Sequence, residues 1–230
     1  MNLRDTVWQA LGTVLDPELD EPITALDFVA SWTVSDDGVA SVHLRLPTFF
    51  CAPNFSFLMV ADAYDAVSAV EGVTRADIVL DDHHASTEIN GGVAAHAGFV
   101  QTFAGEADAE LEDLRRYFLA KAVVAGQDQV ARPLVDAGVG PDELAELTLG
   151  SLPGSPELTR LRTRRSALGL PDDDGAPLLI HPDGAPVSAA QVPLHLRRAR
   201  LTRTSLEANG GVCRGMLRVR YPDATEEEEG

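Results

Sequence analysis

The residue with the most distinctive chemistry in this 230-residue chain is Cys51, in the stretch LRLPTFFCAPNF (residues 44–55). It stands where an alternating strand pattern gives way to a helical pattern. A helix N-terminus presents unpaired backbone N–H groups and a positive potential, which favour the thiolate, the metal-binding form of cysteine. Because iron and zinc sites need three or four ligands, Cys51 is expected to bind metal transiently or in a shared site. The alternative is a small, inert core residue between Phe50 and Phe55.

Two carboxylates near the N-terminus form a second candidate group. Asp16 and Glu18 flank Pro17, directly after a helical pattern. The structural interpretation is that Asp16 accepts hydrogen bonds from the backbone of the following turn. The functional interpretation is that Asp16 or Glu18 lies near Cys51 and supplies an oxygen ligand. The sequence leaves both interpretations open.

A third group, in DDHHASTEIN (residues 81–90), is the densest set of metal-ligand side chains in the chain. Histidine and carboxylate suit iron or zinc, so His83, His84 and Glu88 are candidate ligands. Their spacing matches no closed metal motif, and adjacent histidines on a loop are commonly plain surface residues. The other cysteine, Cys213 in NGGVCRGM, is expected to be buried, and nothing in the sequence brings it to Cys51.

The charge distribution limits the partners. The formal net charge of −18 disfavours binding to nucleic acid or to an anionic membrane. Arginines are nonetheless concentrated in residues 155–220, and Arg197, Arg198 and Arg200 are candidates for binding a protein partner. The alternative is that these arginines pair with acids of the same chain.

Several classes of protein are not indicated. No apolar run is long enough for a membrane helix, and the N-terminus lacks the pattern of a secretory signal, so a cytoplasmic location is expected. Two distant cysteines do not form a disulfide framework. The phosphate-binding, dinucleotide-binding, serine-hydrolase and zinc-protease motifs are absent, so we do not expect an enzyme.

The first hundred residues predict a small α-β-β-α-β unit, a three-stranded sheet with helices on one face. Asn54 is the expected N-cap of the second helix and Gly72 its end. The expected elements are a helix over 3–15, strands over 28–35 and 39–46, a helix over 54–72 and a strand over 73–80.

The remainder predicts a mostly helical extension, so the fold class is α+β. Residues 194–221 are expected to form a helix and then a strand, and Pro182-Asp183-Gly184 is the expected turn of a short hairpin. A helix is also expected over 106–126. Two short helices should follow it, the second starting at Pro141, and a further helix is expected over 156–168. The expected domains are 1–98, a helical region 99–225 that is arginine-rich towards its end, and an acidic tail 226–230.

The first 90 residues resemble the MIP18 (DUF59) family of iron–sulfur and metallocofactor assembly factors. Four motifs of that family occur in order: Val-x-Asp-Pro-Glu after the first helix, Ile-x-x-Leu-Gly-Leu-Val, a Thr-x-x-x-Cys-Pro-like loop before the second helix, and a Gly-Val-x-x-Val strand. The matching residues are Asp16, Pro17 and Glu18; Ile23, Leu26, Phe28 and Val29; Thr48 and Cys51; and Gly72 and Val73. The chain departs from the pattern at Asp27, where glycine is usual, at Ala52, inserted before Pro53, and in residues 81–90, where a Pro-Pro-Trp-like segment is common.

The resemblance implies an assembly or maturation factor that helps to load iron or an iron–sulfur cluster, bound transiently, into a client metalloenzyme. Cys51 would act with the Asp16–Glu18 loop, and the C-terminal half would recognise the client. The long extension resembles accessory proteins of bacterial multicomponent di-iron monooxygenases, so an oxygenase subunit is a candidate client and a homodimer a candidate assembly. The alternative function is a chaperone or scaffold without metal chemistry. A third, weaker hypothesis is a metal-dependent enzyme built on His83, His84 and Glu88.

Overall fold

The structure is a computed structural model that describes residues 2–222, and it contains two compact units. Unit 1 comprises residues 2–113 together with 208–222, and unit 2 comprises residues 114–207. Residues of the region 99–225, expected to be mainly helical, occur in both units, and the expected acidic tail 226–230 lies outside the described residues. Unit 1 includes residues 208–222 as well as its N-terminal segment, and the sequence did not predict this return.

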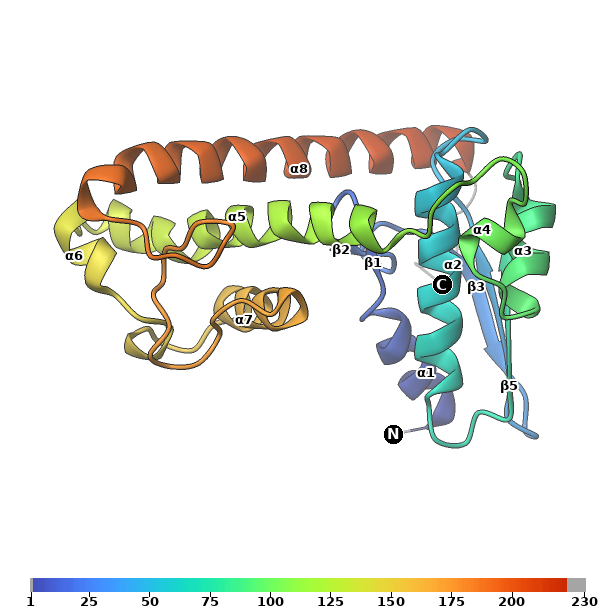
Figure 1. Ribbon diagram of the computed structural model, residues 1–230. Helices are drawn as coiled ribbons and strands as arrows, with labels where there is room; N and C mark the ends of the chain where they lie inside the picture. The colour runs from blue at the N-terminus through green and yellow to red at the C-terminus, as the bar shows by residue number, and fades with distance from the viewer. Residues whose placement is uncertain (1, 223–230) are drawn as a thin grey trace. The chain divides into compact units, whose positions relative to one another are not determined.

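Unit 1 is built on a three-stranded sheet in the order β3-β4-β5 (Figure 1). Strand β3 (Val29–Val34) pairs antiparallel with β4 (Val39–Leu44), which pairs parallel with β5 (Arg75–Leu80). Alternate residues are buried along β4 and β5, because successive side chains of a strand point to opposite faces. The buried set on the helix-covered face is Ala40, Val42, Leu44, Ala76, Ile78 and Leu80.

Helices α1 (Leu3–Leu11) and α2 (Pro53–Ser68) lie against one face of this sheet and against each other (Figure 1). The predicted α-β-β-α-β order and the α+β class are confirmed. The expected cap is wrong: Ala52 is the N-cap of α2, and Pro53 occupies the first helical position. Proline suits that position because its φ is already helical and its missing N–H would have had no helical partner.

A small second sheet follows α1, where β1 (Leu15–Asp16) pairs with β2 (Glu21–Pro22). After it, Asp27 has a φ of 60°, in the left-handed region that favours glycine. This conformation accounts for the glycine that is usual at this position in the family resembled, and aspartate tolerates it better than most residues. Helices α3 (Ser86–Ala94) and α4 (Phe99–Thr102) complete the first segment of unit 1.

There are two long helices, α5 (Glu112–Asp136) and α8 (Val192–Arg220). Each contains residues that belong to unit 1 and residues that belong to unit 2. The expected break after residue 126 is wrong, because α5 continues through Pro133 to Asp136. The expected helix-then-strand at the end is also wrong, because α8 is one helix through Gly210 and Gly211. Between them lie α6 (Pro141–Glu146), η1 (Leu149–Ser151), α7 (Pro156–Leu168) and η2 (Ala189–Gln191), which confirms the predicted helices at Pro141 and 156–168.

Unit 2 has its own core, formed by apolar residues of α5, α6, α7 and the segment 176–192. Arg165 is buried in it and donates to the carbonyl oxygens of Pro177 (2.8 Å) and Leu178 (2.5 Å), and burial lowers its pKa to about 10. The hairpin expected around Pro182-Asp183-Gly184 is reduced to one bridge between Ile180 and Pro186. Within residues 2–222, the helices are all too short or too polar to cross a membrane.

Candidate functional site

Cys51 lies in the loop between β4 and α2, two residues before the first residue of that helix. Its side chain is half-buried and packs against the core of unit 1. The hydroxyl of Thr48 lies 3.4 Å from the sulfur, within hydrogen-bond distance. Cys51 is therefore held in place by its own loop, but it is not enclosed as a plain core residue would be.

His83 fixes the backbone of the Cys51 loop. Its Nδ1 accepts from the N–H of Ala85 (3.2 Å), so Nε2 carries the proton and donates to the carbonyl of Cys51 (2.8 Å). The ring is buried, and burial lowers its pKa, with smaller contributions from His84 and Arg220. His83 is thus a neutral imidazole with both nitrogens in use, so it positions the cysteine loop and leaves no lone pair for a metal.

His84 and two phenylalanines form an exposed aromatic cluster beside Cys51. The Nδ1 of His84 bonds to the carbonyl of Phe49 (3.0 Å), and its ring lies 5.6 Å from that of Phe50. Phe50 is 76% exposed, which is unusual for a side chain of this size. The loop that carries the cysteine therefore presents apolar surface outward.

Asp16 makes the backbone hydrogen bonds of the structural interpretation. Its Oδ1 accepts from the N–H groups of Glu18 (2.8 Å) and Leu19 (2.9 Å) and so holds the turn after β1. Burial raises its pKa to about 6, an effect that the two hydrogen bonds reduce and the charges of Glu18 and Glu21 reinforce. Asp16 is therefore a buried carboxyl group that takes up a proton close to neutral pH.

The two remaining candidate carboxylates differ in position. Glu18 is half-buried, and its side chain makes no hydrogen bond or ion pair among residues 2–222. The negative charge of Glu18 raises the pKa of Asp16 and of Cys213, so the Glu18 carboxylate is a neighbour of both groups. Glu88 is exposed in the first turn of α3, and the structure does not bring it into contact with Cys51.

Cys213, on α8, belongs to this site, although no local pattern in the sequence connects it with Cys51. Both thiols pack against the core of unit 1. The pKa of Cys213 is raised to about 11, mainly by burial and to a smaller extent by the charges of Asp16, Cys51 and Glu18. Cys213 is therefore a protonated thiol at neutral pH.

The last turns of α8 are fastened to the loops around the site. Arg214 forms an ion pair with Glu21 of β2. Arg220 donates to the carbonyl oxygens of Leu46 (3.0 Å), in the loop after β4, and of Asp82 (2.6 Å), in the loop after β5. No sequence motif marks these contacts; the one available signal was the run of arginines at the end of an otherwise acidic chain.

An apolar groove of about 510 Å³ lies along this part of α8. It is lined by Pro47, Val212, Gly215, Met216, Val219 and Arg220. Val219 is 83% exposed and Val212 59% exposed, on the same face of the helix. Unit 1 therefore exposes apolar side chains along α8 as well as at Phe50.

The donor groups near Cys51 do not form a closed metal site. Across the described part of the chain, no three His, Cys, Asp or Glu side chains are arranged to hold a metal ion. The arginines predicted to bind a partner belong to unit 2, on the first turns of α8. Arg197 and Arg200 line a pocket there, and Arg198 does not.

Comparison with known proteins finds a similarity to iron–sulfur cluster assembly proteins over the N-terminal third of the chain. Residues 4–78 match the family model described as iron-sulfur cluster assembly protein. That segment holds α1, most of the three-stranded sheet and the loops of Asp16 and Cys51. No curated protein and no solved structure matches the chain.

Proposed function

We propose that this chain is an assembly or maturation factor that receives iron or an iron–sulfur unit at Cys51 and passes it to a client metalloenzyme. The observation that carries the proposal is the position of Cys51. It lies inside the segment that matches the assembly family, in a loop fixed by His83 and bordered by the exposed Phe50. A fixed thiol beside an exposed apolar surface suits cargo transfer to a docked protein.

The neighbouring groups define what the chain itself can contribute to the cargo. Cys51 provides the first thiolate, and the Thr48 hydroxyl can donate to its sulfur. Cys213 can add a second sulfur only after losing its proton, because its pKa is about 11. Since no three donors converge among residues 2–222, the client supplies the remaining ligands. Weak retention by few ligands favours transfer over storage.

The client is proposed to dock on the apolar surface formed by Phe50 and the α8 groove. Exposed apolar surface rimmed by polar groups is typical of protein-binding sites. Arg220 and Asp82 provide such a rim, and their ion pair ties the groove to the loop after β5. Docking there would place the client next to Cys51.

The test compares Cys51→Ser with Cys213→Ser in cells that express the client. Loss of client iron and activity is expected for Cys51→Ser, with a smaller loss for Cys213→Ser, which serves as the matched control for removal of a thiol. Metal analysis after anaerobic purification should show iron bound by the wild type and lost from Cys51→Ser. Unchanged client iron in Cys51→Ser cells would show that this mechanism is wrong.

The second candidate is a chaperone or scaffold that binds the client without metal chemistry. The exposed apolar residues beside Cys51 favour it equally well, because they require only a protein partner. Client binding and activity that persist in Cys51→Ala, together with the absence of iron in the anaerobically purified wild type, would support this function over the first.

We further propose a cytoplasmic protein with no enzymatic role of its own. The absence of an enzymatic role is supported by the bonds of His83 and His84 to backbone carbonyls of a neighbouring loop, which occupy one ring nitrogen of each. A di-iron monooxygenase as the client rests on the sequence resemblance alone. Isolation of the protein from its own cells, with identification of what co-purifies, decides the client and tests for a homodimer.

A further inference from the structure

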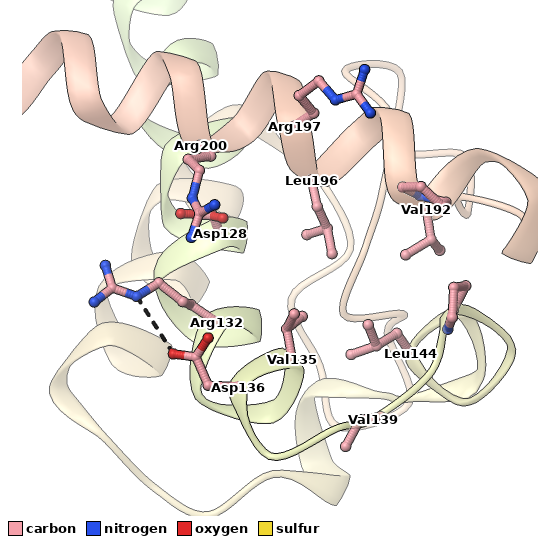
Figure 2. A pocket seen from close by; sticks show the side chains of 12 residues that line it. Asp128, Arg132, Val135, Asp136, Val139, Leu144, Val192, Leu196, Arg197 and Arg200 are labelled. Atoms are coloured by element: carbon pink, nitrogen blue, oxygen red, sulfur yellow. Dashed lines mark ion pairs between the residues drawn. The ribbon is translucent and has the colours of Figure 1, made fainter.

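Unit 2 contains a pocket of about 360 Å³ that the chemistry at Cys51 does not use. Figure 2 shows its walls: the second half of α5, the loop into α6 and the first turns of α8. Its floor is apolar, with Leu144 and Val192 buried and Val139 and Leu196 half-buried. Val135 is 42% exposed at its edge, so apolar surface remains open to solvent.

The acidic side chains that line the pocket have arginine partners, whereas two of its arginines have no acidic partner among residues 2–222. Asp128 is buried and pairs with Arg203 at 2.7 Å. Asp136 faces Arg132 at 3.9 Å (Figure 2). Both acids of the lining therefore already have a cationic neighbour.

Arg197 and Arg200 are the lining cations without such a partner in the described part of the chain. Both are exposed, and neither forms a hydrogen bond or ion pair with any residue among 2–222. They stand three residues apart on one helix, about 4.5 Å along its axis, so each can serve a different anionic group. A guanidinium binds a carboxylate through two parallel hydrogen bonds, which makes carboxylates the best-matched anions.

From this arrangement we propose that the pocket binds a short acidic segment of a partner protein, one that carries an aliphatic side chain between or beside two carboxylates. The aliphatic side chain fills the floor, and the carboxylates pair with Arg197 and Arg200. Amphipathic segments are bound in this way, with apolar anchors giving affinity and charges giving orientation.

Two other occupants fit the pocket less well. Nucleic acid is disfavoured because the lining has no aromatic ring for base stacking and the chain carries a net charge of −18. The chain's own C-terminal sequence, DATEEEEG, is acidic but has no large aliphatic residue for the floor. A partner segment satisfies both halves of the pocket.

The experiment selects random peptides displayed on phage against the full chain, and measures the affinity of the enriched peptides by fluorescence anisotropy. We expect enriched sequences that combine two acids with Leu, Ile or Val. The double variant R197E/R200E should bind them about tenfold more weakly or worse, and Val135→Ser about threefold more weakly. Arg198→Glu, on the same helix but outside the lining, is the matched control and should bind within about twofold of the wild type.

Two outcomes would overturn the proposal. One is selection of peptides without this composition, or of peptides that R197E/R200E binds as well as the wild type does. The other concerns a chain ending at Pro222. If it bound the selected peptides several-fold more tightly than the full chain, and a synthetic DATEEEEG peptide competed with them, the chain's own tail would be the occupant. The assay needs no iron, so its result is independent of whether Cys51 transfers cargo.

Discussion

At the scale of single residues, Asp16 and His83 have pKa values that differ from their ordinary values, so the stability of the folded protein depends on pH. Asp16 binds a proton more tightly in the folded protein, with a pKa of about 6, than in the unfolded chain. The folded state therefore gains relative stability below the unfolded pKa, and loses it as the pH rises through the folded pKa. The neutral His83 acts oppositely, because its lowered pKa removes stability as the pH falls.

The first prediction concerns Asp16→Asn, which keeps the Oδ1 acceptor for the turn and removes the charge. Relative to the wild type, we expect the variant to gain stability between about pH 4 and about pH 7, on the order of 2 kcal/mol. The measurement is urea unfolding at both pH values. Asp65→Asn, at an exposed position of α2, is the control. An equal free-energy difference from the wild type at both pH values would contradict the raised pKa of Asp16.

The second prediction concerns His83, which holds the carbonyl of Cys51. His83→Ala removes that donor, and we expect it to lower the free energy of unfolding by about 2 kcal/mol. The freed loop should also let an alkylating reagent modify Cys51 faster, as followed by mass spectrometry to distinguish it from Cys213. His83→Gln places an amide donor near the position of Nε2 and should restore part of both properties. Equal reactivity of Cys51 in the wild type and in His83→Ala would show that His83 does not position the loop.

At the scale of secondary-structure elements, the unexpected feature is the continuity of α8 through two glycines. A Cβ on Gly210 would lie 2.3 Å from Oε1 of Glu21, the acid that pairs with Arg214. The absence of a side chain at Gly210 therefore lets the helix approach β2. A Cβ on Gly211 would meet no neighbouring element of the described structure within 4 Å, so Gly211 plays no such part.

The third prediction uses these adjacent glycines as a matched pair. Gly211→Ala should stabilise the protein by up to about 1 kcal/mol, because alanine is the better helix former. Gly210→Ala gains the same propensity but must displace the Glu21 carboxylate from Arg214. We expect it to be about 1 kcal/mol less stable than Gly211→Ala in thermal unfolding. Equal midpoints for the two variants would mean that α8 does not depend on close approach at Gly210.

The elements that were predicted well are those whose local pattern agrees with their tertiary setting. The alternation along 39–46 and the apolar stripe of the helix around Phe57 both face a single core, so periodicity alone located them. The break expected within residues 194–221 does not occur. Glycine commonly ends helices, but Gly210 serves a contact with Glu21, near the opposite end of the chain. Such contacts leave no local signal.

The candidate site shows the same division. Cys51 and the turn of Asp16 were identified because each belongs to a short local motif. Cys213 was not connected with them, because its neighbours come from the far end of the chain. His83 was recognised as chemically distinctive, but its bond to the carbonyl of Cys51 depends on how the loop after β5 meets the loop after β4.

At the scale of the whole molecule, unit 1 depends on two separate stretches of sequence. The second stretch contributes Leu217, which is 2% exposed within the core, and the ion pairs of Arg214 and Arg220. The segment that matches the assembly family, residues 4–78, is thus not the whole of the structural unit that contains it. The added stretch contacts the loops of Asp16 and Cys51, which are the parts that carry the proposed function.

The fourth prediction follows from this dependence. A chain ending at Asp113 lacks residues 208–222, so the core around Leu217 is opened and the loops at Leu46 and Asp82 lose their anchor. Burial of one leucine is worth about 2–3 kcal/mol, so the fragment should unfold at clearly lower temperature than unit 1 does in the full chain. It should also bind a hydrophobic dye.

Addition of a synthetic peptide of residues 208–222 to this fragment should raise its melting temperature, because a ligand that binds only the folded state stabilises it. The same peptide with Leu217→Asp is the control and should have no effect. A chain ending at Pro222 should melt like the full chain, since it keeps every contact named here. If the fragment ending at Asp113 melted at the same temperature as that longer chain, the end of α8 would be an accessory to unit 1 rather than part of its core.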